Sequence, residues 1–441
     1  MPLKDLGFRL LSALYELIFK EKMGDEARKL VLGTSYVGVG TLFGALLTLA
    51  FSIIAARALG PSNFGVLGLV TTVGAILGLS MLVCTTPMMK YGSETQNHFE
   101  QVSIFSTSYI LIASVTAAST CIYVLLSAPL SYVFGVPAEL FFFAVFLAVT
   151  STLFQLTINS LRVFFKMRAY ALLTAAQALI LFAAFLTFVS NGMKSWESAA
   201  YSYYLSYVII GVILIIYLKD YIKLRFERSW AKKIVHYSLL ALPGGVAGTF
   251  MGVDRILINK FMTTADVGIY NAYFVSITVA VMLWMVINAA FFPYASKSDD
   301  KLAILRNARK ATPYLAASIA LSVFLLEWII FFFYGRQYPF NWEIALFFAI
   351  AATMAFFYQL LSWLMASEGA RGAKVNTFSS IIALIALVGL DVVLIPLIGI
   401  LGAAITLVFA YLIAAFYLLS KRHVLSANKS SLRQRRELLD E

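Results

Sequence analysis

The stretch ILGAAITLVFAYLIAAFYLLS, residues 400–420, holds no charged residue and decides the fold class. An α-helix rises about 1.5 Å per residue, so a run of about 20 apolar residues matches a hydrocarbon core about 30 Å thick. Lipid offers no partners to backbone N–H and C=O groups, so such a run must satisfy them internally. Residues 400–420 therefore predict a membrane-spanning helix.

Apolar runs of this kind recur along the chain of 441 residues, of which 61% are hydrophobic and 13% charged. That is more apolar surface than a water-soluble core buries. We predict an all-α integral membrane protein of about 12 transmembrane helices. The predicted spans are 34–56, 64–89, 103–128, 138–161, 170–191, 199–218, 236–261, 268–293, 313–334, 342–366, 373–396 and 400–420.

Basic residues mark one side of the predicted membrane protein. All but five of the 34 lysines and arginines lie near the two termini or in loops that follow even-numbered spans. The positive-inside rule then makes both termini cytoplasmic, in a multi-pass protein of the cell membrane. The net charge of +12 is explained by contact with anionic membrane lipids, so no nucleic-acid partner is expected.

Few residues suit enzymatic chemistry. Cys84 and Cys121 fall within predicted spans, the three histidines have no metal-ligand spacing, and no P-loop motif is present. The predicted outer loops are too short for a catalytic domain. We predict no catalytic residues, no metal site and no cofactor, and a protein that is not an enzyme.

An internal repeat divides the chain into halves. RALGPSNFGVL, from Arg57, aligns with KFMTTADVGIY, from Lys260, at an offset of 203 positions. The same offset places Arg168 opposite Arg371 at the start of two later spans. Duplication of a six-helix unit gives both halves one topology, related by an axis along the membrane normal.

The repeat predicts two lobes around a central cavity, as in transporters; a duplicated scaffold without transport is the alternative. The predicted divisions are a cytoplasmic interfacial amphipathic segment at 1–32, an N-terminal bundle at 33–218, a basic linker at 219–235, a C-terminal bundle at 236–420 and a charged cytoplasmic tail at 421–441.

Three segments resemble the polysaccharide transporter family of the multidrug/oligosaccharidyl-lipid/polysaccharide flippase superfamily. They are ARALGPSNFGVLGLV from Ala56, DRILINKFMTTADVGIYNAY from Asp254 and IPLIGILGAAI from Ile395. The resemblance implies a flippase that moves a polyprenyl-linked oligosaccharide from the inner to the outer leaflet by alternating access, and we expect it to work as a monomer. A cation-coupled multidrug-type exporter and a lipid II-type flippase are the alternatives.

Polar residues at membrane depth are the candidate sites. Cavity candidates for substrate binding are Arg57, Gln155, Asn159, Arg168, Arg255 and Arg371. A charge at the centre of a span costs about 2.5–3.5 kcal/mol, so Asp254, Glu327 and Asp391 are candidates for binding a coupling ion, Na+ or H+. We expect these three acids and Arg255 to form one polar cluster. If the cluster is purely structural, Arg255 should contact an acid directly. A purely structural ion pair is the alternative to ion coupling.

Overall fold

The computed structural model describes residues 25–425 except 83, 96, 165, 220, 224, 250, 251, 298–300 and 367. Most of the predicted interfacial segment and charged tail lies outside the described residues. Within them the regular elements are all helical, which confirms the predicted fold class. The helices are α2 (Asp25–Leu82), α3 (Thr85–Glu94), α4 (His98–Leu125), α5 (Ser127–Phe134), α6 (Ala138–Val163), α7 (Met167–Ser190), α8 (Trp196–Tyr217), α9 (Arg228–Thr249), α10 (Asp254–Phe261), α11 (Thr264–Lys297), α12 (Lys301–Tyr334), α13 (Trp342–Ala366), α14 (Gly369–Ile398), α15 (Ile400–Ser420) and the short 3-10 helix η2 (Arg422–Leu425).

Ten described helical stretches are long and apolar enough to cross a membrane. The first, Gly40–Met81, accounts for two predicted spans because α2 bends at Gly60, where φ is 74°. Proline at 61 cannot continue the hydrogen bonding of the preceding helix, and glycine tolerates the positive φ. The seventh predicted span is outside the ten because its helix is interrupted between α9 and α10.

The repeat extends to the helix boundaries. When 203 is added to its residue numbers, α6 covers 341–366, which agrees with the bounds of α13 to within one residue. In the same way α8 covers 399–420, which agrees with α15 to within one residue. The start of α2 falls on the start of α9 in the same way. The internal repeat predicted from three short segments therefore holds for most of the chain. The exact domain divisions stay a prediction.

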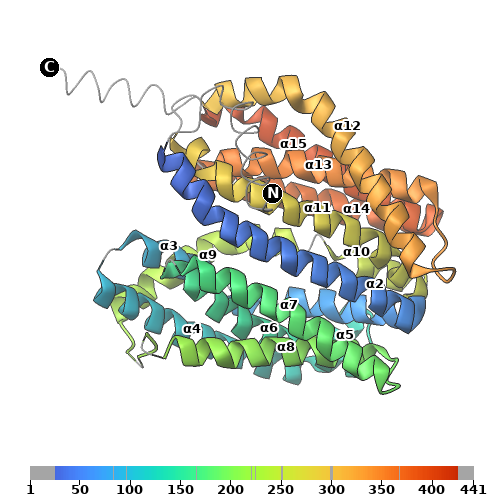
Figure 1. Cartoon of the computed structure of the whole chain (residues 1–441), viewed down its shortest axis with the longest axis horizontal. Helices are drawn as coiled ribbons and strands as arrows, with labels where there is room; N and C mark the ends of the chain where they lie inside the picture. Colours follow the sequence, from blue (N-terminus) through green and yellow to red (C-terminus); the bar gives the residue numbers. More distant parts are fainter. Residues whose placement is uncertain are drawn as a thin grey trace, which may run out of the picture.

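Each repeat forms its own group of helices. In Figure 1 the helices α3 to α8 lie on one side of α2, and α11 to α15 lie on the other. α2 packs against α6 and α7 of its own half and against α11 of the second half. α9 lies between the two groups: it packs against α14 of the second half and, to a similar extent, against α2, α3 and α4 of the first, where Ile234 joins an apolar cluster.

The two ends of the helical bundle differ in their loops. Five glycines with positive φ, Gly60, Gly135, Gly192, Gly335 and Gly399, lie in turns at one end, which we call the glycine end. The other end, which we call the basic end, carries the basic loops after α3, α6, α8 and α13.

The halves meet at the glycine end along a seam of α2 and α11 that follows the repeat. A Cβ on Gly65 would collide with the Thr264 carbonyl, and a Cβ on Gly268 would collide with the Pro61 carbonyl. Gly65 and Gly268 are 203 positions apart, as are Pro61 and Thr264. This reciprocal contact places the pseudo-two-fold axis between the two glycines, and only glycine permits so close an approach.

Candidate functional site

The interruption of the seventh span positions the first candidate acid. α9 ends at Thr249 and α10 begins at Asp254, whose side chain is fully buried. Its carboxylate accepts hydrogen bonds from the Tyr270 hydroxyl and from the Arg255 backbone N–H, the latter at 3.0 Å. Interrupted membrane helices present backbone and polar groups at membrane depth, as ion and substrate sites of transporters do.

The second candidate acid is Asp391 on α14. It is fully buried and lies within electrostatic reach of Asp254. The hydroxyl of Thr406 on α15 lies beside it. Neither carboxylate oxygen of Asp391 nor the Thr406 hydroxyl has a hydrogen-bond partner among the described residues. A buried carboxylate needs a hydrogen-bond donor, a cation or a proton to offset its loss of hydration. Asp254, Asp391, Tyr270 and Thr406 are called the acid pocket below.

Glu327, the third candidate acid, has a hydrogen-bond partner of its own. It lies on α12, is 1% exposed and accepts a 2.6 Å hydrogen bond from Ser276 on α11. Its second carboxylate oxygen has no hydrogen-bond partner among the described residues. No described hydrogen bond joins Glu327 to the acid pocket, and the expected single cluster of four charges stays a prediction.

The Arg255 guanidinium makes no described hydrogen bond to an acid, unlike the direct contact expected of a purely structural cluster. Only the Arg255 backbone N–H reaches Asp254, while the side chain extends toward the first half. There Nε donates to Asn271 at 2.6 Å and Nη1 donates to Thr72 at 3.2 Å. Adjacent helical residues point about 100° apart, which explains why the two side chains separate.

Gln155 and Asn159 share one face of α6. Gln155 is exposed and Asn159 is half-buried, and the Asn159 amide donates to the Gln155 backbone carbonyl at 2.8 Å. Toward the glycine end the same face, at Ala144 and Ala148, is fully buried. That face is therefore buried toward the glycine end and exposed toward the basic end.

The remaining arginine candidates lie at the ends of the bundle. Arg168 in the first turn of α7 and Arg371 in the first turns of α14 are both exposed at the basic end, at equivalent positions of the repeat. Arg57 is exposed at the glycine end, where its backbone carbonyl accepts a 2.7 Å hydrogen bond from Gln337. Whether these three contact substrate stays a prediction.

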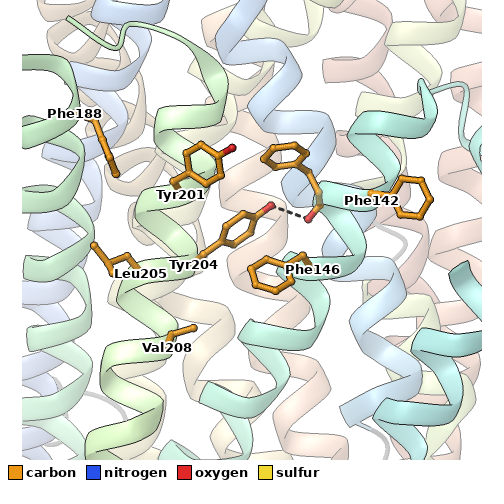
Figure 2. A pocket seen from close by; sticks show the side chains of 8 residues that line it. Phe142, Phe146, Phe188, Tyr201, Tyr204, Leu205 and Val208 are labelled. Atoms are coloured by element: carbon orange, nitrogen blue, oxygen red, sulfur yellow. Dashed lines mark hydrogen bonds between the residues drawn. The ribbon is translucent and has the colours of Figure 1, made fainter. Parts of the chain in front are cut away.

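An apolar groove of about 580 Å³ lies near the glycine end of the first half. Figure 2 shows the Tyr204 hydroxyl turned to the Phe143 carbonyl, a 2.9 Å hydrogen bond, which leaves the groove wall apolar. The lining comes from α6, α7 and α8: Phe142, Phe143, Phe146, Phe188, Tyr201, Tyr204, Leu205 and Val208. The groove holds none of the predicted site residues.

Sequence reasoning missed the residues that contact the candidates, among them Tyr270, Asn271, Thr72 and Thr406. Tyr270 and Asn271 lie inside a segment that carries the repeat, where they could be noticed as polar departures from Leu67 and Gly68. Thr72 and Thr406 resemble any other threonine of an apolar span, so only the fold shows their role.

Comparison with known proteins places the chain. A family model described as polysaccharide biosynthesis protein matches residues 54–343, about two thirds of the chain. No curated protein matches the sequence. A transporter of the MOP superfamily from Pyrococcus furiosus has a similar structure, with a TM-score of 0.66, 14% identity and coverage of 92% of this chain and 99% of that one.

Multidrug transporters have the same architecture. A MATE protein in complex with MaD3S gives a TM-score of 0.64 at 15% identity over 94% of this chain and 98% of its own. An outward-facing multidrug resistance MATE transporter gives 0.63 at 15% identity over 93% and 100%. These likenesses show the fold. The chain thus belongs to the polysaccharide biosynthesis protein family and has the transporter fold of the MOP superfamily.

Proposed function

We propose that this protein translocates a lipid-linked oligosaccharide from the cytoplasmic to the outer leaflet of the cell membrane by alternating access. The family supports the saccharide substrate, and the fold supports transport without a catalytic reaction. The basic end is the cytoplasmic end by the positive-inside rule, which also places both termini in the cytoplasm.

The observation that carries this proposal is the seam. The two halves touch through backbone at Gly65 and Gly268 at the glycine end, while the polar face of α6 opens toward the basic end. These two observations support a state closed at the outer side and accessible from the inner side. Both halves of the repeat lie in one chain, which supports function as a monomer.

The test is translocation in vesicles. Purified protein is reconstituted with a polyprenyl-diphosphate oligosaccharide that carries a fluorescent label on its sugar, and a membrane-impermeant quencher is added outside. We expect quenching of the inner-leaflet pool only in vesicles that contain the protein. Equal quenching in protein-free vesicles would contradict the proposal.

We also propose that the acid pocket binds the coupling ion, Na+ or H+. Two neighbouring buried carboxylates repel each other when both are ionised, and a shared cation relieves that repulsion. The carboxylate oxygens of Asp391 and the Thr406 hydroxyl oxygen have no hydrogen-bond partner among the described residues. These oxygens would coordinate a hard cation, and the Asp391 carboxylate would bind a proton.

The structural likeness to MATE transporters favours one second candidate, a cation-coupled exporter of small amphiphiles. Both candidates use the acid pocket, but they differ in cargo. Transport of a fluorescent organic cation, with no movement of the labelled lipid-linked oligosaccharide, would favour the exporter.

A further inference from the structure

The step from Asp254 to Arg255 joins the acid pocket to the contact between the two halves. Asp254 is buried among second-half residues, and its neighbour Arg255 reaches Thr72 of the first half. A Cβ at Gly252 would lie 3.2 Å from Nη1 of Arg255 and 3.8 Å from the Thr72 methyl group, so glycine leaves room for this crossing. Asp254 therefore belongs to the acid pocket, while Arg255, the next residue, belongs to the contact between the two halves.

Among the described residues, the groups that contact the Arg255 guanidinium are uncharged. They are the Asn271 side-chain oxygen, the Thr72 hydroxyl and the ring of Phe274, whose centroid lies 4.3 Å from Cζ. An arginine bound to a buried carboxylate would be costly to release. Neutral partners lower the free-energy cost of separating the halves, because Arg255 then loses only one described hydrogen bond to the first half, the one to the Thr72 hydroxyl.

Asn271 holds the guanidinium at the seam. It lies against Gly68 of the first half, where a Cβ would collide with its side-chain nitrogen. Gly68 and Asn271 are 203 positions apart, so the repeat has substituted an amide for a glycine at the axis. The Asn271 side-chain oxygen accepts from Nε of Arg255, while Nη1 of the same guanidinium reaches Thr72 of the first half.

We propose that Arg255 is a positioning residue that transmits the charge of the acid pocket to the closure of the glycine end. When Asp254 is ionised, its charge attracts the neighbouring guanidinium and weakens the contact with Thr72. When a cation or a proton neutralises Asp254, the guanidinium is released toward Thr72 and the halves close. This inference rests on the proposed transport function and adds a direction: occupation of the acid pocket favours the state closed at the glycine end.

The proposal is tested without knowledge of the coupling ion. Asp254→Asn imitates the neutral carboxyl while it keeps an oxygen that accepts from the Arg255 N–H. Spin labels on cysteines at Glu139 and Glu343, exposed residues in the first turns of α6 and α13, report the distance between the halves at the glycine end. The background carries Cys84→Ala and Cys121→Ala.

We expect Asp254→Asn to raise the ratio of short to long distances about ten-fold, and Arg255→Gln or Thr72→Val to lower it by a similar factor. Combined with either of the latter changes, Asp254→Asn should have no effect on the ratio. The matched control is Thr71→Val, whose hydroxyl donates to the Gly68 carbonyl of its own helix at 3.0 Å and has no described bond to the second half.

Independent effects of Asp254→Asn and Thr72→Val, or no effect of Asp254→Asn, would overturn the relay. A Thr71→Val effect as large as that of Thr72→Val would do the same. The vesicle translocation assay on the unmodified protein judges the transport function separately, so failure of the relay with intact translocation leaves the proposed function standing.

Discussion

The two halves share a backbone plan but differ in what fills equivalent positions. Asp254, Asp391 and Thr406 of the second half correspond, at the offset of 203, to Phe51, Phe188 and Tyr203 of the first. The Phe51 ring packs 5.4 Å from the Tyr203 ring, where the second half has the acid Asp254 and the hydroxyl of Thr406. At these three positions the first half is aromatic, while the second half has two acids and a threonine.

This difference separates two roles. Aromatic edge contacts stabilise packing and have nothing to titrate or coordinate. Buried carboxylates destabilise the fold unless something neutralises them, so their presence in one half indicates a function. We infer that the first half is the rigid partner and that the second half responds to ions.

The largest expected effect breaks the symmetric seam. Gly65→Ala or Gly268→Ala places a Cβ against a backbone carbonyl of the other half, which cannot move aside as a flexible side chain would. We expect loss of the state closed at the glycine end and at least about a ten-fold loss of translocation.

The matched controls for the seam are Gly211→Ala and Gly389→Ala, one in each half. A Cβ at either position meets no atom within 4 Å. Vesicle translocation and spin-label distances are measured for all four variants. Equal losses in the seam variants and the controls would show that the seam is not the site of closure.

The second prediction concerns the acidic half. Asp391→Asn removes a charge whose oxygens have no protein partner, so folding should be little affected while the response of translocation to an ion gradient is lost. Glu327→Gln is the comparison, because Glu327 already accepts from Ser276 outside the acid pocket. Translocation is measured with and without sodium and proton gradients. Retained gradient dependence in Asp391→Asn would remove Asp391 from coupling.

The third prediction concerns the aromatic half. Phe51→Leu removes ring contacts to Phe185 at 5.1 Å and to Tyr203, and should cost about 1 kcal/mol of stability. Gradient dependence should be unchanged, because the first half holds no equivalent acid. Thermal unfolding in detergent and the gradient assay are measured together. A loss of coupling without a loss of stability would contradict the division of roles.

Much of the fold followed from the sequence because membrane thickness fixes helix length and the repeat fixes topology. The sequence predicts one helix over 236–261, because the apolar run contains no signal for the interruption before Asp254. It does single out Asp254 and Asp391, because charge at membrane depth is costly. It does not predict the direction of the Arg255 side chain, because Thr72 is 183 residues away and no local pattern links them.

The smallest expected effect concerns the attachment of the second half to the first at the basic end. Glu227, just before α9, accepts hydrogen bonds from Ser103 of α4 at 2.5 Å and from Ser229 at 2.8 Å. These bonds favour the carboxylate and lower the pKa of Glu227 below its usual range.

A lowered pKa in the folded state means that the attachment stabilises the fold at pH values above the ordinary glutamate range, and that this stabilisation is lost as the pH falls through the lowered pKa. Glu227→Gln should therefore lower the unfolding temperature slightly at pH 7 and have less effect at about pH 3.5. Glu94→Gln, an exposed residue at the end of α3, is the control. Thermal unfolding at both pH values decides the matter. A difference between Glu227→Gln and the unmodified protein that grows on acidification would show that the Ser103 contact favours the protonated acid. The negative charge of Glu227 would then not stabilise the attachment of the second half to the first.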